Sequence, residues 1–142
     1  MRDMEGLDVG GLDMEPLRIA ILGQGRSGRD IHGKHLHAHP DKFRIVAVVD
    51  PLADRRCRAA DEYGCETFER HEALFGRTDL DLVVNATPSH LHVPVTEDLL
   101  THGFHVLCEK PFARTATEAD RIIETASRSG RRLFVFQQSR FA

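Results

Sequence analysis

Apolar runs and polar stretches alternate along the chain from residue 17 onward. Short runs rich in β-branched residues predict buried strands at 17–22, 43–49, 82–86, 104–108 and 133–136, with a weaker strand at 66–68. The stretches between them predict helices near 26–39, 53–63, 94–102 and 115–128. Strands that alternate with helices in this way form βαβ units. The pattern therefore predicts an α/β fold, a Rossmann-type doubly wound parallel sheet in a single domain.

The helix expected at 115–128 carries the clearest local signals. Thr115 and Glu118 have the spacing of a capping box, and Gly130 follows as a stop. An apolar stripe with helical spacing is expected to face the core, formed by Ala119, Ile122, Ile123 and Ala126.

The length of 142 residues suits one domain of ordinary size. Residues 1–15 contain glycines and acidic residues without a periodic apolar pattern, so we expect a flexible segment there. Residues 16–142 are then expected to form the Rossmann domain.

A glycine-rich turn joins the first predicted strand to the first predicted helix. It consists of Gly23, Gln24, Gly25, Arg26, Ser27 and Gly28, the pattern GxGxxG, and it has the strand–turn–helix context that binds a dinucleotide. Gly23 would make the tight turn, Gly25 would let the backbone approach a diphosphate, and Gly28 would let helix and strand pack closely. The helix N-terminus attracts an anion, so the whole turn is a candidate cofactor site.

Asp50 ends the second predicted strand, about 20 residues after the last glycine, where the dinucleotide pattern places a carboxylate for the ribose 2′-hydroxyl. A carboxylate repels a 2′-phosphate, so NAD is favoured over NADP. Arg55 and Arg56 follow closely and could bind that phosphate, so NADP stays possible. A methyltransferase that uses S-adenosylmethionine is a weaker alternative, because its cofactor also suits three glycines and an acid.

Three further strand ends carry polar segments. One contains Thr87, Pro88 and His92, the second is Glu109-Lys110-Pro111, and the third contains Gln138 and Arg140. Together with the glycine turn and Asp50, these segments resemble the glucose–fructose oxidoreductase, inositol dehydrogenase and rhizopine-catabolism family (Gfo/Idh/MocA) from Leu17 to the end of the chain.

The resemblance assigns roles to these segments. It implies that Lys110 is catalytic, beside the nicotinamide and the substrate hydroxyl, with Glu109 next to it. It implies that Thr87, Pro88 and His92 line the dinucleotide, and that Gln138 and Arg140 lie near its nicotinamide end. A lysine with a lowered pKa is able to take a hydroxyl proton, whereas pairing with Glu109 would oppose that shift, so the residues leave this balance open.

The resemblance also implies an activity. Family members transfer hydride between a nicotinamide cofactor and a sugar, a polyol or a related secondary alcohol, and a second domain supplies their substrate pocket. This chain ends where that domain would begin, so we expect a truncated NAD(P)-binding domain that is inactive alone, binds substrate only with a second domain, and self-associates through uncovered surface. A non-catalytic NAD-binding regulator or sensor is the alternative.

Charge and cysteine content exclude several classes. A formal charge of −3 argues against a nucleic-acid partner or an anionic membrane surface, and the apolar runs are too short to span a membrane. Three cysteines without paired spacing argue against a disulfide framework, so a cytoplasmic protein is expected. Four clustered histidines are expected to be incidental rather than a metal site: His32, His35, His37 and His39.

Overall fold

The computed structural model describes residues 15–136 of the chain. The expected flexible segment at 1–15 therefore lies almost wholly outside the described residues. So do two of the candidate site residues, Gln138 and Arg140.

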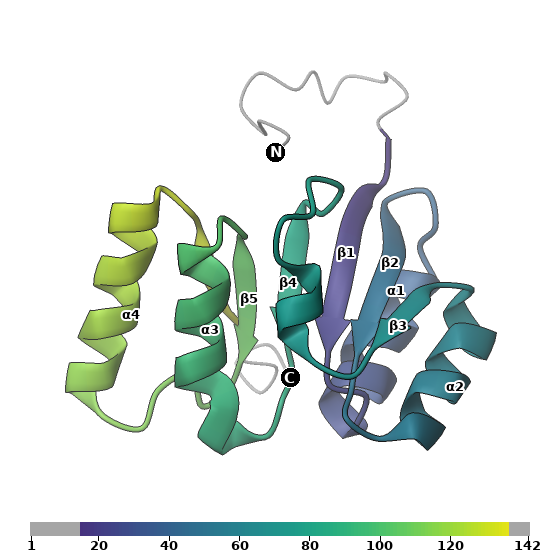
Figure 1. The fold of residues 1–142 in the computed structure, drawn as a ribbon, viewed down its shortest axis with the longest axis horizontal. Helices are drawn as coiled ribbons and strands as arrows, with labels where there is room; N and C mark the ends of the chain where they lie inside the picture. Colours follow the sequence, from purple (N-terminus) through teal and green to yellow (C-terminus); the bar gives the residue numbers. More distant parts are fainter. Residues whose placement is uncertain (1–14, 137–142) are drawn as a thin grey trace.

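Six strands form one parallel sheet, in the order β3-β2-β1-β4-β5-β6 (Figure 1). The strands are β1 (Leu17–Leu22), β2 (Phe43–Val49), β3 (Glu66–Phe68), β4 (Leu82–Asn85), β5 (Val106–Glu109) and β6 (Leu133–Phe136). This is the strand order of a dinucleotide-binding Rossmann fold, so the predicted fold class is confirmed.

The connections between strands contain the helices and short turns of the fold. A π-helix, η1 (Arg26–Gly33), continues into α1 (Lys34–His37); the longer helices are α2 (Ala53–Tyr63), α3 (His92–Thr101) and α4 (Ala116–Ser129). Two short 3₁₀ turns, η2 (His71–Leu74) and η3 (Ser89–Leu91), were not predicted. Among residues 15–136, no helix combines the length and the apolar character that crossing a membrane requires.

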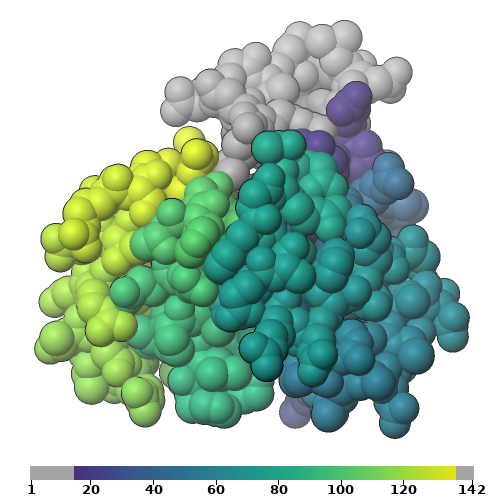
Figure 2. All heavy atoms as spheres, viewed as in Figure 1, coloured from purple at the N-terminus to yellow at the C-terminus, as the bar shows by residue number. Residues whose placement is uncertain are grey.

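The two faces of the sheet are covered by different helices. Along β1, Ile19 and Ile21 pack toward α1 and α2, whereas Ala20 and Leu22 pack toward α3 and α4. This alternation follows from the period of two in a strand, and burial on both faces explains why the strands are almost continuously apolar. In Figure 2, α3 and α4 lie directly side by side, with side chains filling the space between them.

Most predicted element boundaries lie within one residue of the structure, and the larger differences include two near the candidate site. α3 starts at His92 rather than Pro94, and β5 runs from Val106 through Glu109 rather than from Phe104 to Cys108. Glu109 is therefore the last residue of a buried strand.

The helix-end signals of α4 are confirmed. Thr115 accepts a hydrogen bond from the backbone N–H of Glu118 at 3.1 Å, and Gly130 takes a left-handed conformation with φ of 65°. The predicted apolar stripe is wrong at Ile123, which is 54% exposed, because the buried side of the helix turns toward Ile122 and Thr125 instead.

Candidate functional site

The glycine turn packs too tightly for side chains at two positions. Gly23 has φ of +92°, and a Cβ there would overlap the carbonyl oxygen of Ala86 in the neighbouring strand end. A Cβ on Gly28 would overlap the carbonyl oxygen of Gly23. At Gly25, by contrast, a Cβ would meet Arg55 Nη1 at an ordinary 3.5 Å. Gly23 thus makes the tight turn and Gly28 lets the helix pack closely, as the sequence predicts, whereas Gly25 faces more open space.

The helix that follows the turn is wound as a π-helix over its eight residues, Arg26–Gly33. Its N-cap residue is Gly25, and no side chain among residues 15–136 caps it. Uncapped N–H groups and the helix dipole make this end favourable for an anion. π-helical turns are rare in proteins, and those that occur are often found at functional sites. The π-helical conformation of η1 is therefore a further indication that this segment belongs to a binding site.

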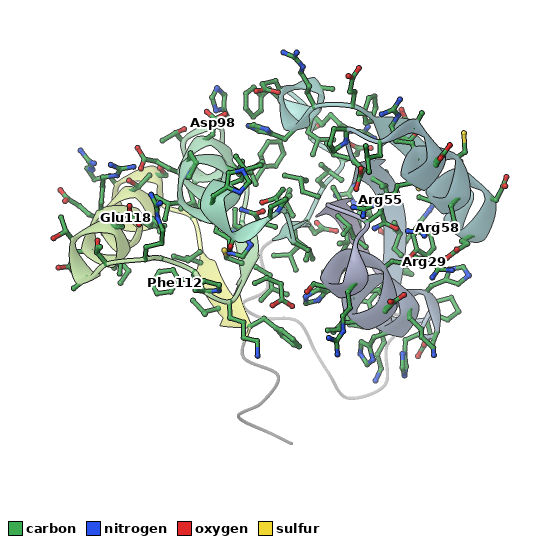
Figure 3. All side chains as sticks on the ribbon, turned by 90° about the horizontal axis from the view of Figure 1, so that it is seen from below. Arg29, Arg55, Arg58, Asp98, Phe112 and Glu118 are labelled. Atoms are coloured by element: carbon green, nitrogen blue, oxygen red, sulfur yellow. The ribbon has the colours of Figure 1, made fainter. Side chains whose placement is uncertain are left out.

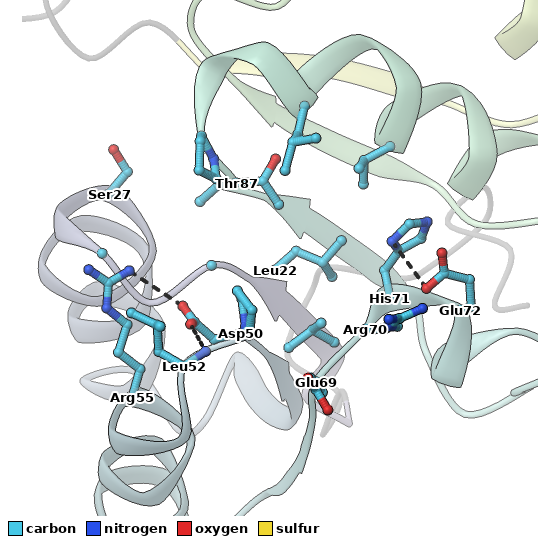
Figure 4. Close-up of a pocket in the computed structure, with 18 of the residues that line it drawn as sticks. Leu22, Ser27, Asp50, Leu52, Arg55, Glu69, Arg70, His71, Glu72 and Thr87 are labelled. Carbon is cyan, nitrogen blue, oxygen red and sulfur yellow. Dashed lines mark hydrogen bonds and ion pairs between the residues drawn. The ribbon is translucent and has the colours of Figure 1, made fainter.

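Asp50 holds the glycine turn against the end of β2. Its carboxylate accepts hydrogen bonds from the backbone N–H of Gln24 at 2.8 Å and of Leu52 at 2.9 Å, and it is 2% exposed. Arg55 Nη1 lies 3.6 Å from the same carboxylate, whereas Arg56 donates to the carbonyl oxygens of Asp50 and Pro51. The Arg56 guanidinium is therefore bonded to the backbone, and of these two arginines it is Arg55 that lines the pocket (Figure 4).

A cavity of about 750 Å³ opens at this point, where β1 and β4 lie side by side and their connections leave to opposite faces of the sheet. Ligands of open α/β sheets bind at such switch points. Seven of the predicted cofactor residues line the cavity: Gly23, Gly25, Arg26, Ser27, Asp50, Thr87 and Pro88. The open glycine, the uncapped helix end and the carboxylate fit a dinucleotide.

Other predicted residues lie behind or beyond this cavity rather than in its wall. Gln24 and Gly28 are buried beneath the turn, His92 begins α3, Glu109 ends β5, and Lys110 follows β5 directly. The segment after β3 adds lining residues that were not predicted: Glu69, Arg70, His71 and Glu72 (Figure 4).

Arg58 of α2 is a further residue that the sequence did not indicate. Its Nη2 donates to the carbonyl oxygen of Gln24 at 2.7 Å and so braces the glycine turn from outside. Figure 3 looks at the carboxyl ends of the strands and shows Arg29, Arg55 and Arg58 gathered on the same side of the molecule. Gln24 Nε2 bonds the carbonyl oxygen of Gly23 at 3.1 Å, and its Oε1 is buried with no partner in the described part of the chain.

The segment between β4 and α3, residues 86–91, is called the Thr87 loop here, and polar side chains hold it in place. Asn85, fully buried, accepts from the Thr87 hydroxyl at 2.6 Å and donates to the Thr96 hydroxyl at 2.9 Å. His92 lies with Nε2 2.7 Å from the carbonyl oxygen of Thr87 and Nδ1 2.8 Å from that of Pro111. His92 therefore connects the loop after β4 to the segment after β5.

Glu109 and Lys110 face different surroundings. Lys110 is exposed, and the peptide bond between it and Pro111 is cis. Glu109 is buried, and one of its oxygens lies 2.7 Å from His32 Nε2. The expectation that all four clustered histidines are incidental is thus wrong for His32, whose partner is 77 residues away in the chain. His35 and His37 are exposed, as expected for surface histidines.

Cys108, next to Glu109, has no exposed surface. Burial, together with the negative charge of Glu109, raises the pKa of its thiol to about 11. The group is therefore a neutral thiol at ordinary pH, as expected for a structural cysteine.

One group of metal-ligating types comes together at the cavity rim. His71, Glu72 and Asp98 have ligand atoms within 4.8 Å of one another. His71 Nε2 lies 2.7 Å from an Asp98 carboxylate oxygen, and this hydrogen bond connects η2 to α3. No sequence motif indicates this cluster, because Asp98 is 27 residues from His71.

Comparisons with known proteins support the same reading. Residues 17–137 match the family model Gfo/Idh/MocA, described as an oxidoreductase family with an NAD-binding Rossmann fold. Inositol 2-dehydrogenase 4 of Saccharopolyspora erythraea is 35% identical over 118 residues, which cover 82% of this chain and 35% of that protein. The rhizopine catabolism protein MocA of Rhizobium meliloti is 35% identical over 115 residues, covering 81% of this chain and 35% of that protein.

Solved structures agree with the fold. The WlbA dehydrogenase of Bordetella pertussis, in complex with NADH and UDP-GlcNAcA, superposes with a TM-score of 0.82 at 28% identity, covering 89% of this chain and 38% of that one. A 3-ketoreductase of Actinomadura kijaniata, in complex with TDP-benzene and NADP, has a TM-score of 0.76 at 29% identity. The match covers 88% of this chain and 40% of that one.

This chain spans about a third of the length of the curated relatives it matches, where the shares are 35%. The match covers the glycine turn, Asp50, the Thr87 loop and the Glu109-Lys110-Pro111 segment, and it rules out the methyltransferase alternative. The chain belongs to the Gfo/Idh/MocA oxidoreductase family and forms its NAD-binding Rossmann-fold domain.

Proposed function

We propose that this domain serves an oxidoreductase that transfers hydride between NAD and a hydroxyl of a sugar, a polyol or a related secondary alcohol. The observation that carries the proposal is the convergence of the glycine turn, Asp50 and the Thr87 loop on one cavity. The names of the relatives, which include inositol and glucoside dehydrogenases, support the substrate class.

The cavity accounts for the adenosine and diphosphate part of the cofactor. The diphosphate binds at the N-terminus of η1, where Arg26 and Ser27 line the wall. The Asp50 carboxylate keeps accepting capacity beyond its two backbone bonds, because a carboxylate has about four acceptor positions. It receives the ribose hydroxyls and disfavours a 2′-phosphate, which favours NAD. Arg55, 3.6 Å away, is the group that would lessen this preference.

Lys110 is the proposed catalytic residue at the other end of the cofactor. It follows β5 directly, at the carboxyl edge of the sheet that also carries the cavity. When bound, the nicotinamide supplies the hydride acceptor or donor. Lys110 takes or returns the proton of the substrate hydroxyl. Gln138 and Arg140 remain predicted neighbours of that end.

The test is calorimetric titration of the chain with NADH and NADPH, using Asp50→Asn and the matched control Asp54→Asn, which alters an exposed acid of α2. We expect NADH to bind at least about tenfold more tightly than NADPH, and Asp50→Asn to remove most of that preference. Asp54→Asn should retain it. Equal binding of both cofactors by the unaltered chain would contradict the NAD assignment, and binding of neither would contradict the proposed site.

A non-catalytic NAD-binding regulator remains the alternative, because binding alone does not distinguish the two. Adding the second domain of a relative in trans, with NAD and a polyol, separates them. Turnover that depends on Lys110 favours the enzyme, whereas binding without turnover favours the regulator.

Self-association is also proposed. β6 is one of the two edge strands of the sheet, and Phe134 and Val135 on it are 47% and 43% exposed. Exposed apolar edge strands pair with other chains. Sedimentation should give a mass above the monomer, and Val135→Lys should return it to the monomer. A monomeric unaltered chain would contradict the proposal.

A further inference from the structure

A buried pair joins the first helix to the end of β5. His32 and Glu109 side chains are each 6% exposed, and His32 Nε2 lies 2.7 Å from Glu109 Oε1. Burying a carboxylate costs folding free energy unless the group is paired and hydrogen-bonded. The contact with His32 therefore offsets much of the cost of burying Glu109. The ring of Phe136 packs edge-to-face on His32 at 4.7 Å and restricts the imidazole further.

The same carboxylate holds Lys110. Glu109 Oε2 accepts the backbone N–H of Lys110 at 3.1 Å. One residue later, the carbonyl oxygen of Pro111 lies 2.8 Å from His92 Nδ1. The segment Glu109–Pro111 is therefore held at two points: His32 fixes its start through the Glu109 carboxylate, and His92 fixes its end.

His32 also belongs to the element that begins at the glycine turn. It lies four residues after Gly28 in η1, whose N-terminus is the proposed diphosphate site. A single helix thus carries the diphosphate site at one end and the anchor of Glu109 near the other. A misplacement of about 1 Å at a reacting group is enough to cost much of a rate, so such an anchor has a functional consequence.

We propose that His32 is a positioning residue: through Glu109 it sets the place of Lys110 relative to the cofactor bound at the glycine turn. The inference rests on the proposed function, because it takes Lys110 to lie at the nicotinamide end. It adds a residue that makes no contact with the cofactor itself.

The test follows Lys110 directly by NMR. The chain has three lysines, at positions 34, 42 and 110, so replacing Lys34 and Lys42 by Arg leaves Lys110 as the single lysine side chain for ¹³C-methyl labelling. Its resonance is recorded with saturating NADH and with saturating ADP-ribose, which lacks the nicotinamide. The difference between the two positions is the nicotinamide-dependent shift.

In this background, His32→Leu should reduce the nicotinamide-dependent shift to less than about half, while ADP-ribose affinity stays within about threefold. His32→Gln, which keeps a side-chain N–H donor, should restore part of it, a recovery that simple space filling would not give. The control His35→Gln, an exposed histidine of α1, should leave the shift unchanged.

A wild-type shift in His32→Leu, with ADP-ribose still bound, would overturn the inference. If His32→Leu loses ADP-ribose binding through misfolding, Glu109→Leu decides, because a leucine side chain can bond neither His32 nor the Lys110 N–H. An unchanged nicotinamide-dependent shift in that variant overturns the inference too. Absence of any nicotinamide-dependent shift in the unaltered protein is a different result: it removes Lys110 from the nicotinamide end and contradicts the proposed function itself.

Discussion

The two sides of the cavity are built by different means. At the glycine turn after β1, backbone approaches backbone: Gly28 lies against Gly23, and Gly23 lies against Ala86, directly after β4. On the β4–β5 side, buried polar side chains make the contacts, from Asn85 to Thr87 and from His92 to Pro111. At Gly23 and Gly28 the close approach leaves no room for a side chain, although Asp50 and Arg58 also bond the glycine turn there. The other side depends instead on side-chain hydrogen bonds.

This difference determines how each side fails. A close backbone approach has no room to adjust, so one added methyl group must displace a helix or a strand. A hydrogen-bonded network loses contacts one at a time, and its cost is set by the polar groups left unpaired in the interior. Substitutions should therefore lower the free energy of unfolding more, and in a more all-or-none way, at the glycine turn than in the hydrogen-bonded network.

The largest effect is expected from Gly28→Ala. Its Cβ would overlap the carbonyl oxygen of Gly23, so η1 must move away from β1. We expect the free energy of unfolding to fall by about 3 kcal/mol or more, with loss of NADH binding. Urea unfolding followed by circular dichroism, with calorimetry for binding, measures both.

Gly25→Ala is the matched control for that change. An added Cβ there meets Arg55 Nη1 at 3.5 Å, so stability should change by less than about 1 kcal/mol. NADH affinity should still fall, because the methyl group occupies the open side toward the diphosphate. If Gly28→Ala and Gly25→Ala lowered stability equally, Gly28 would not be more tightly packed than Gly25, and the distinction drawn here would be wrong.

A smaller effect is expected from Asn85→Ala on the other side. The change removes the hydrogen bonds that Asn85 makes with the half-buried Thr87 and with the buried His92 and Thr96. We expect a loss of about 2 kcal/mol in the free energy of unfolding and a several-fold weaker NADH affinity. The same unfolding and binding measurements apply.

Ser89→Ala, an exposed position in the same loop, should stay within about 0.5 kcal/mol of the unaltered chain. A loss at Asn85 as large as that at Gly28 would mean that both sides are equally intolerant. No loss at Asn85 would mean that the Thr87 loop is held by contacts other than this network.

Much of the fold was predictable because its signals are local. The strand β2 and the helix α2 have the limits that the sequence indicated, and Gly64 ends α2 with φ of 62° as a C-terminal glycine should. Exposure of Ile123 was not predictable, since a stripe of apolar residues defines a helix face only to within one position. The neighbour against which α4 packs decides which position is buried.

The candidate site divides in the same way. The sequence by itself determined the glycine turn, the acid that follows β2 and the order of strands and helices along the chain, because each depends on residues close together in the chain. Only the tertiary structure decided that His32 meets Glu109, 77 residues away, that Arg58 braces Gln24, and that His92 joins two loops. Such contacts depend on the order of strands in the sheet and on how the helices pack over it. The spacing of residues along the chain does not indicate that arrangement.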